Sequence, residues 1–453
     1  MKKLNFDLNK LLRKTKPEAF LATSFLAMIL IGTILLTLPF STISGITFID
    51  AFFTSTSATC VTGLVVVDTG TTFTLFGQAV ILILMQFGGI GIMTFAALAF
   101  HILGIRLSLR AQEATSSSII QNNFASEFKP ILFRIISLIM IIELIGAVLL
   151  FIGFLPKADP QSAIWSAVFH SVSAFCNAGF SLYSDSLIGF RDNPIIIATI
   201  IFLIIIGGIG FPVLDDIGRF IKNKTSKSYK INRISLHSKV VILTSLGLII
   251  IGTIFLFVFS FNSDYGIFQR ISISFFQSVT ARTAGFNTIE IGNLPSVSIL
   301  ILIVLMFIGG SPGSCAGGIK TTTFSLWISQ MWSRLHEGYG TNVFGRYIPQ
   351  EITRRVSTII GISIWWNIIG TFILLATQHL SSTMSFEDIF FEQISAFGTV
   401  GLSTGITSSL NLLGKLWIII TMYIGRIGPL TIIVLMLRKK TTIRYPEGRI
   451  MVG

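Results

Sequence analysis

The chain alternates long apolar segments with short segments of mixed polarity. Eight apolar segments approach or exceed the roughly 20 residues that an α-helix needs to cross a bilayer. They cover approximately 17–40, 74–101, 131–155, 194–221, 239–261, 296–320, 355–378 and 412–437. A shorter and more polar segment lies inside each successive pair, and these begin near Phe48, Gln161, Phe268 and Phe386. Because they are too short to span, they are predicted to be re-entrant half-helices.

Composition and charge agree with a membrane protein. Charged residues make up 12% of the chain, about half the fraction in soluble proteins. Most of the 33 basic residues lie before the first span, after the last, or between an even span and the next odd one. The positive-inside rule therefore predicts a plasma-membrane protein whose basic N-terminus (1–16) and C-terminal tail (438–453) are both cytoplasmic. This distribution explains the net charge of +13 without nucleic acid, and we expect the basic loops to contact anionic lipids.

The half-helix segments are copies of one repeat. They align on a glycine, and the four glycines are 116, 106 and 116 positions apart: Gly63, Gly179, Gly285 and Gly401. A phenylalanine stands ten residues before each, although residue types shift by one position in the third copy: Phe53, Phe169, Phe275 and Phe391. A second glycine motif follows each: GGIG at 88–91, GGIG at 207–210, GGSPG at 309–313 and GRIG at 425–428.

This repeat predicts the fold class. We expect an all-α integral membrane protein with four M1–P-loop–M2 units arranged pseudo-fourfold around one central ion pathway. The units are predicted at 17–104, 131–221, 237–327 and 353–437. Re-entrant segments are tolerated at membrane depth where their backbone lines a water-filled cavity. A ring of their carbonyls can replace the hydration shell of a monovalent cation, and glycine permits the positive φ that such a turn needs.

At these residues the chain resembles the Trk/Ktr/HKT superfamily of potassium transporters, and specifically its Ktr-type membrane subunits. The resemblance implies potassium uptake, with one filter glycine per P-loop and ion-binding carbonyls on the residues just before it. The implied filter residues are Val61, Thr62, Gly63, Asn177, Ala178, Gly179, Thr283, Ala284, Gly285, Thr399, Val400 and Gly401. The alternative is a Na⁺ or mixed Na⁺/K⁺ transporter of the same fold. Plant relatives that prefer Na⁺ have serine at the first filter position, so Gly63 favours K⁺.

The second span of the third repeat contains a stretch that cannot form a stable helix. Five glycines and a proline lie between Met306 and Phe324, so we expect an irregular intramembrane loop. The resemblance implies that this loop is a gate beneath the filter. The implied gating residues are Gly309, Gly310, Ser311, Pro312, Gly313, Ser314, Ala316, Gly317, Gly318, Lys320 and Arg426. A nucleotide-binding P-loop is not expected here, because Ile319 separates Gly318 from Lys320.

Several charges fall inside the predicted spans, where they are costly and need partners. Arg426 occupies the position that is glycine in the other repeats, and its guanidinium can donate to carbonyls of the loop. Arg282 precedes the third filter strand, and we expect it to point away from the pore and to pair with an acidic residue. Glu143 and the pair Asp215–Asp216 are interpreted as structural charges without assigned partners.

Other function classes find little support. The three cysteines and five histidines lack metal-ligand spacing, so no cofactor is expected in this chain beyond K⁺ as the transported ion and Na⁺ as a candidate activator. An intramembrane enzyme would need a catalytic dyad at membrane depth, and His170 has no evident partner. A receptor or structural protein would not explain four glycine-ended half-helices. The resemblance also implies a homodimer and a cytosolic, nucleotide-binding regulatory ring of RCK type.

Overall fold

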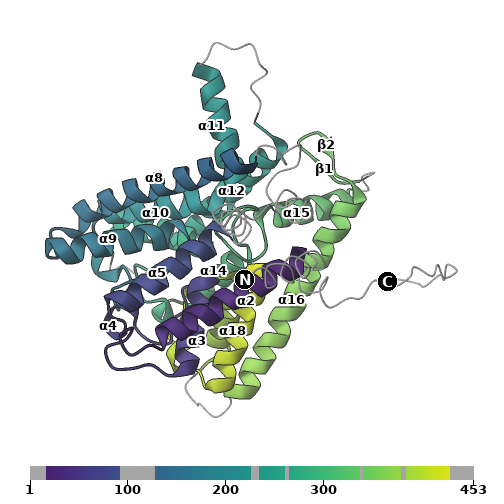
Figure 1. Ribbon diagram of the computed structural model, residues 1–453. Coiled ribbons are helices and arrows are strands. Elements are labelled where there is room, and N and C mark those ends of the chain that lie inside the picture. Colours follow the sequence, from purple (N-terminus) through teal and green to yellow (C-terminus); the bar gives the residue numbers. More distant parts are fainter. Residues whose placement is uncertain are drawn as a thin grey trace, which may run out of the picture.

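The computed structural model describes residues 17–91, 128–225, 234–260, 265–336, 340–378 and 384–428, and these are mostly helical. The first two repeats have the same order of elements: a long helix, a half-helix, a short turn and a second long helix (Figure 1). In the first repeat these are α2 (Pro17–Leu36), α3 (Phe48–Thr59), α4 (Thr69–Thr72) and α5 (Leu75–Ile90). In the second they are α8 (Phe128–Phe154), α9 (Pro160–Phe175), η1 (Ile188–Phe190) and α10 (Pro194–Ile209), followed by α11 (Phe211–Thr225).

The third and fourth repeats follow the same plan. The third contains α12 (Leu236–Phe259), α13 (Ile267–Thr280), η2 (Ile291–Asn293) and α14 (Ser296–Phe307), and then α15 (Thr321–Leu335). A small hairpin of β1 (Asn342–Val343) and β2 (Arg346–Tyr347) leads to the fourth repeat. That repeat contains α16 (Gln350–Gln378), α17 (Phe386–Gly398), η3 (Thr407–Ser409) and α18 (Leu412–Ile427).

The half-helices begin at strong start signals. Thr47, Asp159 and Ser385 each accept a hydrogen bond from a backbone N–H of the first turn of α3, α9 and α17. These caps satisfy donors that a helix start would otherwise leave unpaired. The third half-helix, α13, starts at Gly266 and has no side-chain cap.

The second long helix of each repeat is shorter than predicted. In α5, α10 and α18 the last glycine of the downstream motif caps the helix with positive φ: 83° at Gly91, 96° at Gly210 and 93° at Gly428. After Gly210 the chain turns by 100° into α11, which projects away from the bundle (Figure 1). The segment predicted to span at 194–221 is therefore two helices joined at a sharp bend, because glycine at this position ends a helix. The segment at 296–320 contains the predicted break. The ends of the segments at 74–101 and 412–437 lie outside the described residues.

By length and apolar composition, three described helical segments could cross a membrane alone: Ile135–Phe154, Leu236–Phe259 and Gln350–Gln378. The bent pair of α10 and α11 could form a fourth. All three are first helices of their repeats, and their outward positions are apolar and exposed, as at Leu144 and Phe372. An exposed apolar face of this kind fits contact with lipid.

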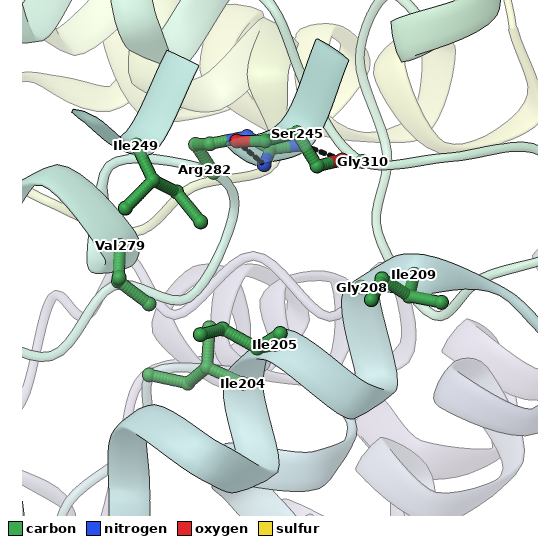
Figure 2. A pocket seen from close by; sticks show the side chains of 9 residues that line it. All are labelled: Ile204, Ile205, Gly208, Ile209, Ser245, Ile249, Val279, Arg282 and Gly310. Atoms are coloured by element: carbon green, nitrogen blue, oxygen red, sulfur yellow. Dashed lines mark hydrogen bonds between the residues drawn. The ribbon is translucent and has the colours of Figure 1, made fainter. Parts of the chain in front are cut away.

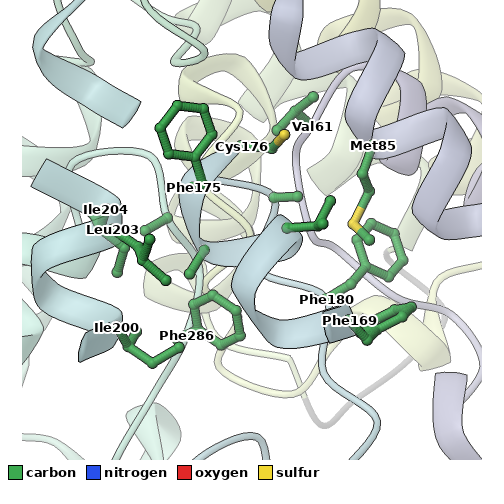
Figure 3. Close-up of a cluster of buried hydrophobic side chains, with 14 of the residues drawn as sticks. Val61, Met85, Phe169, Phe175, Cys176, Phe180, Ile200, Leu203, Ile204 and Phe286 are labelled. Atoms are coloured by element: carbon green, nitrogen blue, oxygen red, sulfur yellow. The ribbon is translucent and has the colours of Figure 1, made fainter. Parts of the chain in front are cut away.

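The hydrophobic core surrounds the four short segments that the sequence predicts as the filter, called the filter strands below: 61–63, 177–179, 283–285 and 399–401. The residue directly after each filter glycine is large, apolar and at most 1% exposed: Leu64, Phe180, Phe286 and Leu402. Around the second strand, Val61 and Met85 from the first repeat and Phe286 from the third belong to one buried cluster with Phe175 and Leu203 of the second (Figure 3). Because close-packed side chains resist displacement, this core fixes the position of the strands that it encloses.

Candidate ion pathway

The four predicted filter glycines meet in a closed ring. All have positive φ: 89° at Gly63, 68° at Gly179, 83° at Gly285 and 90° at Gly401. A Cβ on any of them would fall under 3.0 Å from a carbonyl oxygen of the next repeat. In order around the ring, those carbonyls belong to Ala178, Ala284, Val400 and Thr62. Each repeat therefore contacts the next, and the fourth returns to the first.

The residues before the glycines share a second backbone feature. Two positions before each glycine, a non-glycine residue also has positive φ: 57° at Val61, 58° at Asn177, 79° at Thr283 and 50° at Thr399. This conformation costs energy for a residue with a Cβ. It recurs in all four strands, which are at most 1% exposed at the two residues before the glycine. A repeated strained conformation in a tightly packed site indicates function.

A hydroxyl on each half-helix ties down its filter strand. Gly63 and Gly401 donate their N–H to Ser57 Oγ and Ser395 Oγ, both at 3.1 Å. Ser173 Oγ and Thr280 Oγ1 donate to the carbonyls of Phe180 (2.8 Å) and Phe286 (2.7 Å). Three of these hydroxyls stand six residues before their glycine, whereas Thr280 stands five before Gly285.

In the third repeat the stretch from the half-helix hydroxyl to the glycine is thus one residue shorter, and this corrects the sequence alignment. Phe53, Phe169 and Phe391 are fully buried, but Phe275, their predicted equivalent, is 36% exposed. Phe276 is 1% exposed and takes the buried place. Because helix positions one residue apart face directions about 100° apart, counting ten residues back selects the wrong side chain in this repeat.

The downstream glycine motif permits close approach of two backbones. In the first, second and fourth repeats, Gly88, Gly207 and Gly425 lie against carbonyls at the end of their own half-helix, with no room for a Cβ. In the third repeat Gly309 lies instead against the carbonyl of Gly317. Here the irregular segment 308–320 replaces the helix–helix contact.

A further fourfold contact was not predicted. Glycines in the four first helices lie against polar side chains of the half-helices, and the pairs are Gly32–Ser55, Gly146–Ser171, Gly252–Ser278 and Gly370–Gln393. In the first three repeats the serine Oγ also donates to the carbonyl three residues before that glycine, at 2.6 to 2.8 Å. Single glycines and serines in long apolar helices carry little signal, so only a four-way alignment with the register shift could have found them.

The segment 308–320 fills the space beneath the ring. It runs from the end of α14 to the start of α15, and Ile308 pairs with Ile319 in a parallel bridge. It binds the broken end of α10: Ser311 N–H donates to Gly208 O at 3.1 Å, and Cys315 N–H donates to Gly207 O at 3.2 Å. A Cβ on Gly317 would strike the side chain of Thr399, so the segment touches the fourth filter strand from below.

Arg426 joins this segment to two other repeats, as its position predicts. Its guanidinium donates to the carbonyl of Cys315 in the segment and to the carbonyl of Gly88 in α5. Lys320 Nζ donates to Ala316 O at 2.6 Å within the segment. Cys60, Cys176 and Cys315 are all buried free thiols.

Arg282 lies in a different setting from the one predicted. Its guanidinium donates to Ser245 O and Ser245 Oγ, both at 3.2 Å, and to Gly309 O at 3.5 Å. No acidic side chain forms an ion pair with it in the described part of the chain. It borders a small cavity of about 30 Å³ between α10, α12 and α13 (Figure 2). The prediction of an acidic partner is wrong, because carbonyl and hydroxyl oxygens, and no carboxylate, accept the hydrogen bonds of Arg282 among the described residues.

Each of the remaining predicted charges has a partner. Glu143 accepts a hydrogen bond from Gln86 Nε2 at 3.0 Å. Asp215 pairs with Arg219, and Asp216 accepts from the N–H of Ser235 at 2.9 Å. These contacts agree with a structural role for all three.

At the outer turn of the first repeat, the carboxyl of Asp68 is partly buried and caps α4. Burial raises its pKa, but hydrogen bonds from Ser184, Thr71 and Gly70 outweigh burial and hold the pKa below its ordinary value. Asp68 therefore carries a negative charge at neutral pH.

Known proteins resemble the chain along its length. The model of the family TrkH, described as cation transport protein, matches residues 7–442. Proteins named Ktr system potassium uptake protein B are 39% identical in Bacillus subtilis, covering 98% of both chains, and 36% identical in Vibrio alginolyticus, covering 95% of this chain and 93% of the relative. The potassium/sodium uptake protein NtpJ of Enterococcus hirae is 37% identical over 97% of this chain and 98% of its own. The crystal structure of the potassium transporter TrkH from Vibrio parahaemolyticus matches with a TM-score of 0.67 and 22% identity, covering 92% of this chain and 85% of that one.

Proposed function

Because the chain belongs to the TrkH family of cation transport proteins, we propose that it takes up potassium ions across the plasma membrane through the ring of filter strands. The observation that carries this proposal is the closed ring, in which each glycine lies against a carbonyl of the next repeat. Carbonyl oxygens gathered in this way can replace the hydration shell of K⁺. The ligands come from the three-residue strands 61–63, 177–179, 283–285 and 399–401.

The segment 309–320 and Arg426 act as the gate in this proposal. The segment lies directly under Thr399, and Arg426 holds it through the carbonyl of Cys315. Arg426 also places positive charge beneath the ring. At short range in a poorly solvated site, like charges repel strongly, so the closed arrangement opposes a cation both sterically and electrostatically. Opening requires that the segment leave its contacts with α10 and Arg426.

Partners and sodium belong to the same proposal. Two relatives are named as parts of a Ktr system, which supports a membrane subunit that works with a regulatory component. We expect that component to be a cytosolic nucleotide-binding ring of RCK type, and the membrane subunit to be a homodimer in contact with anionic lipids, with both termini cytoplasmic. The relative named for potassium and sodium uptake supports Na⁺ as an activator or second substrate, whereas Gly63 favours K⁺.

The test is Rb⁺ uptake into proteoliposomes with Na⁺ as competitor. Gly285→Ser places a Cβ against Val400 O in a backbone of φ 83°, so we expect weakened selectivity or lost uptake. Gly45→Ser is the matched control, because Gly45 also has φ 83° but has nothing within 4 Å of its Cβ position. Saturable Rb⁺ uptake that only Gly285→Ser disturbs supports the filter. Absent uptake, or uptake that both variants leave unchanged, contradicts it.

A further inference from the structure

A buried polar side chain stands behind each filter strand. It lies on the half-helix nine residues before the filter glycine, or eight in the shorter third repeat. The four residues are Thr54, His170, Gln277 and Glu392, all at most 2% exposed. Three of the four contact the chain just after it leaves the filter. A buried polar group needs a partner, so these contacts show how well each strand is held at its outer end.

Glu392 makes the most complete set of contacts. Ser403 Oγ donates to one carboxylate oxygen at 2.9 Å, and Thr407 Oγ1 donates to the other. Ser403 stands two residues after Gly401, and its Oγ also accepts the N–H of Gly405 at 3.0 Å. The carboxylate therefore fixes a tight turn at the outer end of the fourth strand.

His170 repeats this arrangement in the opposite repeat. Its Nδ1 lies 2.7 Å from Ser166 O and its Nε2 lies 3.0 Å from Ser181 Oγ. Because a carbonyl can only accept, Nδ1 donates, and the neutral ring accepts from Ser181 at Nε2. Ser181 stands two residues after Gly179, and its Oγ accepts the N–H of Tyr183 at 3.0 Å. The second and fourth strands thus share one device built from different side chains.

The other two strands are held less well. Gln277 Nε2 donates to Thr288 Oγ1 at the long distance of 3.5 Å, and its Oε1 has no partner among the described residues. Thr54 Oγ1 likewise has no partner in the part of the chain that the structure describes. Val65, whose side chain cannot form a hydrogen bond, stands at the position of Ser181 and Ser403. The backbone ring is fourfold, but its outer support is strongest in the fourth and second repeats, weaker in the third and weakest in the first.

We propose that Glu392 is a specificity-determining positioning residue, which sets ion preference by clamping the outer end of the fourth filter strand through Ser403 and Thr407. This role rests on the proposed potassium uptake. A carbonyl filter separates K⁺ from Na⁺ by the spacing and number of its oxygens. Ser395 Oγ holds the strand 399–401 at the N–H of Gly401, and Glu392 holds the chain just beyond it at Ser403. Release of the contact at Ser403 lets the carbonyls of the strand move toward the smaller ion.

The test compares Na⁺ competition against Rb⁺ uptake in proteoliposomes for three variants of the full chain. Ser403→Ala removes one hydroxyl from the clamp and leaves the buried carboxylate in place. We expect the preference for Rb⁺ over Na⁺ to fall about fivefold, the factor that corresponds to one buried hydrogen bond. Glu392→Gln keeps the length and one accepting oxygen, so it should retain an intermediate preference. Glu387→Gln, on the exposed face of the same half-helix, is the control and should match the unsubstituted chain.

Hydrogen exchange of the backbone amides at 401–407 reports on the clamp without requiring transport. Faster exchange there in Ser403→Ala, with unchanged exchange at 179–185, supports the clamp. Unchanged exchange at 401–407 overturns it. Normal uptake with unaltered ion preference in both clamp variants overturns the specificity role alone. Absent Rb⁺ uptake by the unsubstituted chain overturns the proposed function and the specificity role together.

Discussion

The filter ring and the layer directly beneath it are built on opposite principles. In the ring, all four repeats contribute the same backbone: a strained residue, a carbonyl and a glycine with positive φ. Beneath the ring the repeats diverge. The helices α5, α10 and α18 all end at a glycine with positive φ, but α10 is followed by a bend into α11, the third repeat is irregular at 308–320, and the fourth carries a charge at Arg426.

The difference follows from what each layer has to do in the proposed pathway. A spherical ion is held best by equivalent ligands on all sides, so the backbone of the ring tolerates little variation between repeats. Closing a pathway needs one element that moves and another that holds it. Two repeats can then supply the segment and Arg426, while the other two supply the surfaces on which they rest.

The largest effect is expected from breaking the ring at its closing contact. In Gly401→Ala a Cβ would meet the Thr62 carbonyl from a backbone with φ 90°. Strain of this kind costs about 1–3 kcal/mol, so we expect Rb⁺ uptake to fall by up to about a hundredfold. Gly45→Ala shares the positive φ without the contact and should transport normally. Equal losses in both variants would show that backbone strain, not the ring, is responsible.

An opposite effect is expected in the layer beneath. Arg426→Gln removes charge and at least one of the donations to Cys315 O and Gly88 O. With the segment released, Rb⁺ uptake by the membrane subunit alone should rise about tenfold, since a charged hydrogen bond is worth about 1.5–3 kcal/mol. Arg355→Gln, which breaks an exposed ion pair with Glu351, is the control. Unchanged or reduced uptake in a folded Arg426→Gln protein would contradict the role of a latch.

A smaller effect is expected where the glycines of the first helices pack against the half-helices. A Cβ at Gly252 would lie 2.5 Å from Ser278 Oγ and 2.7 Å from Leu305 Cδ1, whereas one at Gly247 on the same helix meets nothing within 4 Å. Gly252→Ala should therefore destabilise the protein by about 1–3 kcal/mol through overpacking. Gly247→Ala should be neutral or stabilise it by up to about 1 kcal/mol. Thermal unfolding in detergent separates the two, and equal shifts would show that the glycine contact is not selective.

The smallest effect is expected at the seam between the fourth and first repeats. Lys415 Nζ lies 2.7 Å from Asp50 Oδ1, with side chains only 15% and 14% exposed. Removing the lysine leaves a mostly buried carboxylate, so Lys415→Met should cost about 1–2 kcal/mol. The pair of Arg355 and Glu351 is 67% and 75% exposed, and Arg355→Met should cost less than about 0.5 kcal/mol. Similar unfolding temperatures for both variants would show that the pair of Lys415 and Asp50 does not stabilise the seam.

The sequence predicted the repeat architecture because glycine is required wherever φ is positive or a Cβ has no room. Those demands placed the filter glycines, the downstream motif and the irregular segment at their observed positions. The position of Arg426 likewise predicted its donation to a carbonyl of the segment. A charge at that depth has few available partners other than the carbonyls of irregular backbone.

The errors arose where one residue type fits two structures. Phe275 and Phe276 are equally apolar, so only packing shows which one is buried. The GGIG motif at 207–210 reads as part of an apolar span, yet its last glycine ends α10. Arg282 was assigned an acidic partner because a buried cation needs neutralising contacts, but backbone and hydroxyl oxygens can provide them. The polar residues behind the strands were overlooked because Thr54, His170, Gln277 and Glu392 share no residue type.

The contacts of Arg426 also bear on how the protein is made. The ring is completed by Gly401 against Thr62, and the segment beneath it is held by Arg426, so both depend on the half-helix α17 and the helix α18 of the fourth repeat. A nascent chain that has inserted three repeats has neither a complete filter nor a latch. The two arrive together when α17 and α18 enter the bilayer. In the proposed pathway, insertion of this hairpin therefore completes the filter and supplies its latch in the same step.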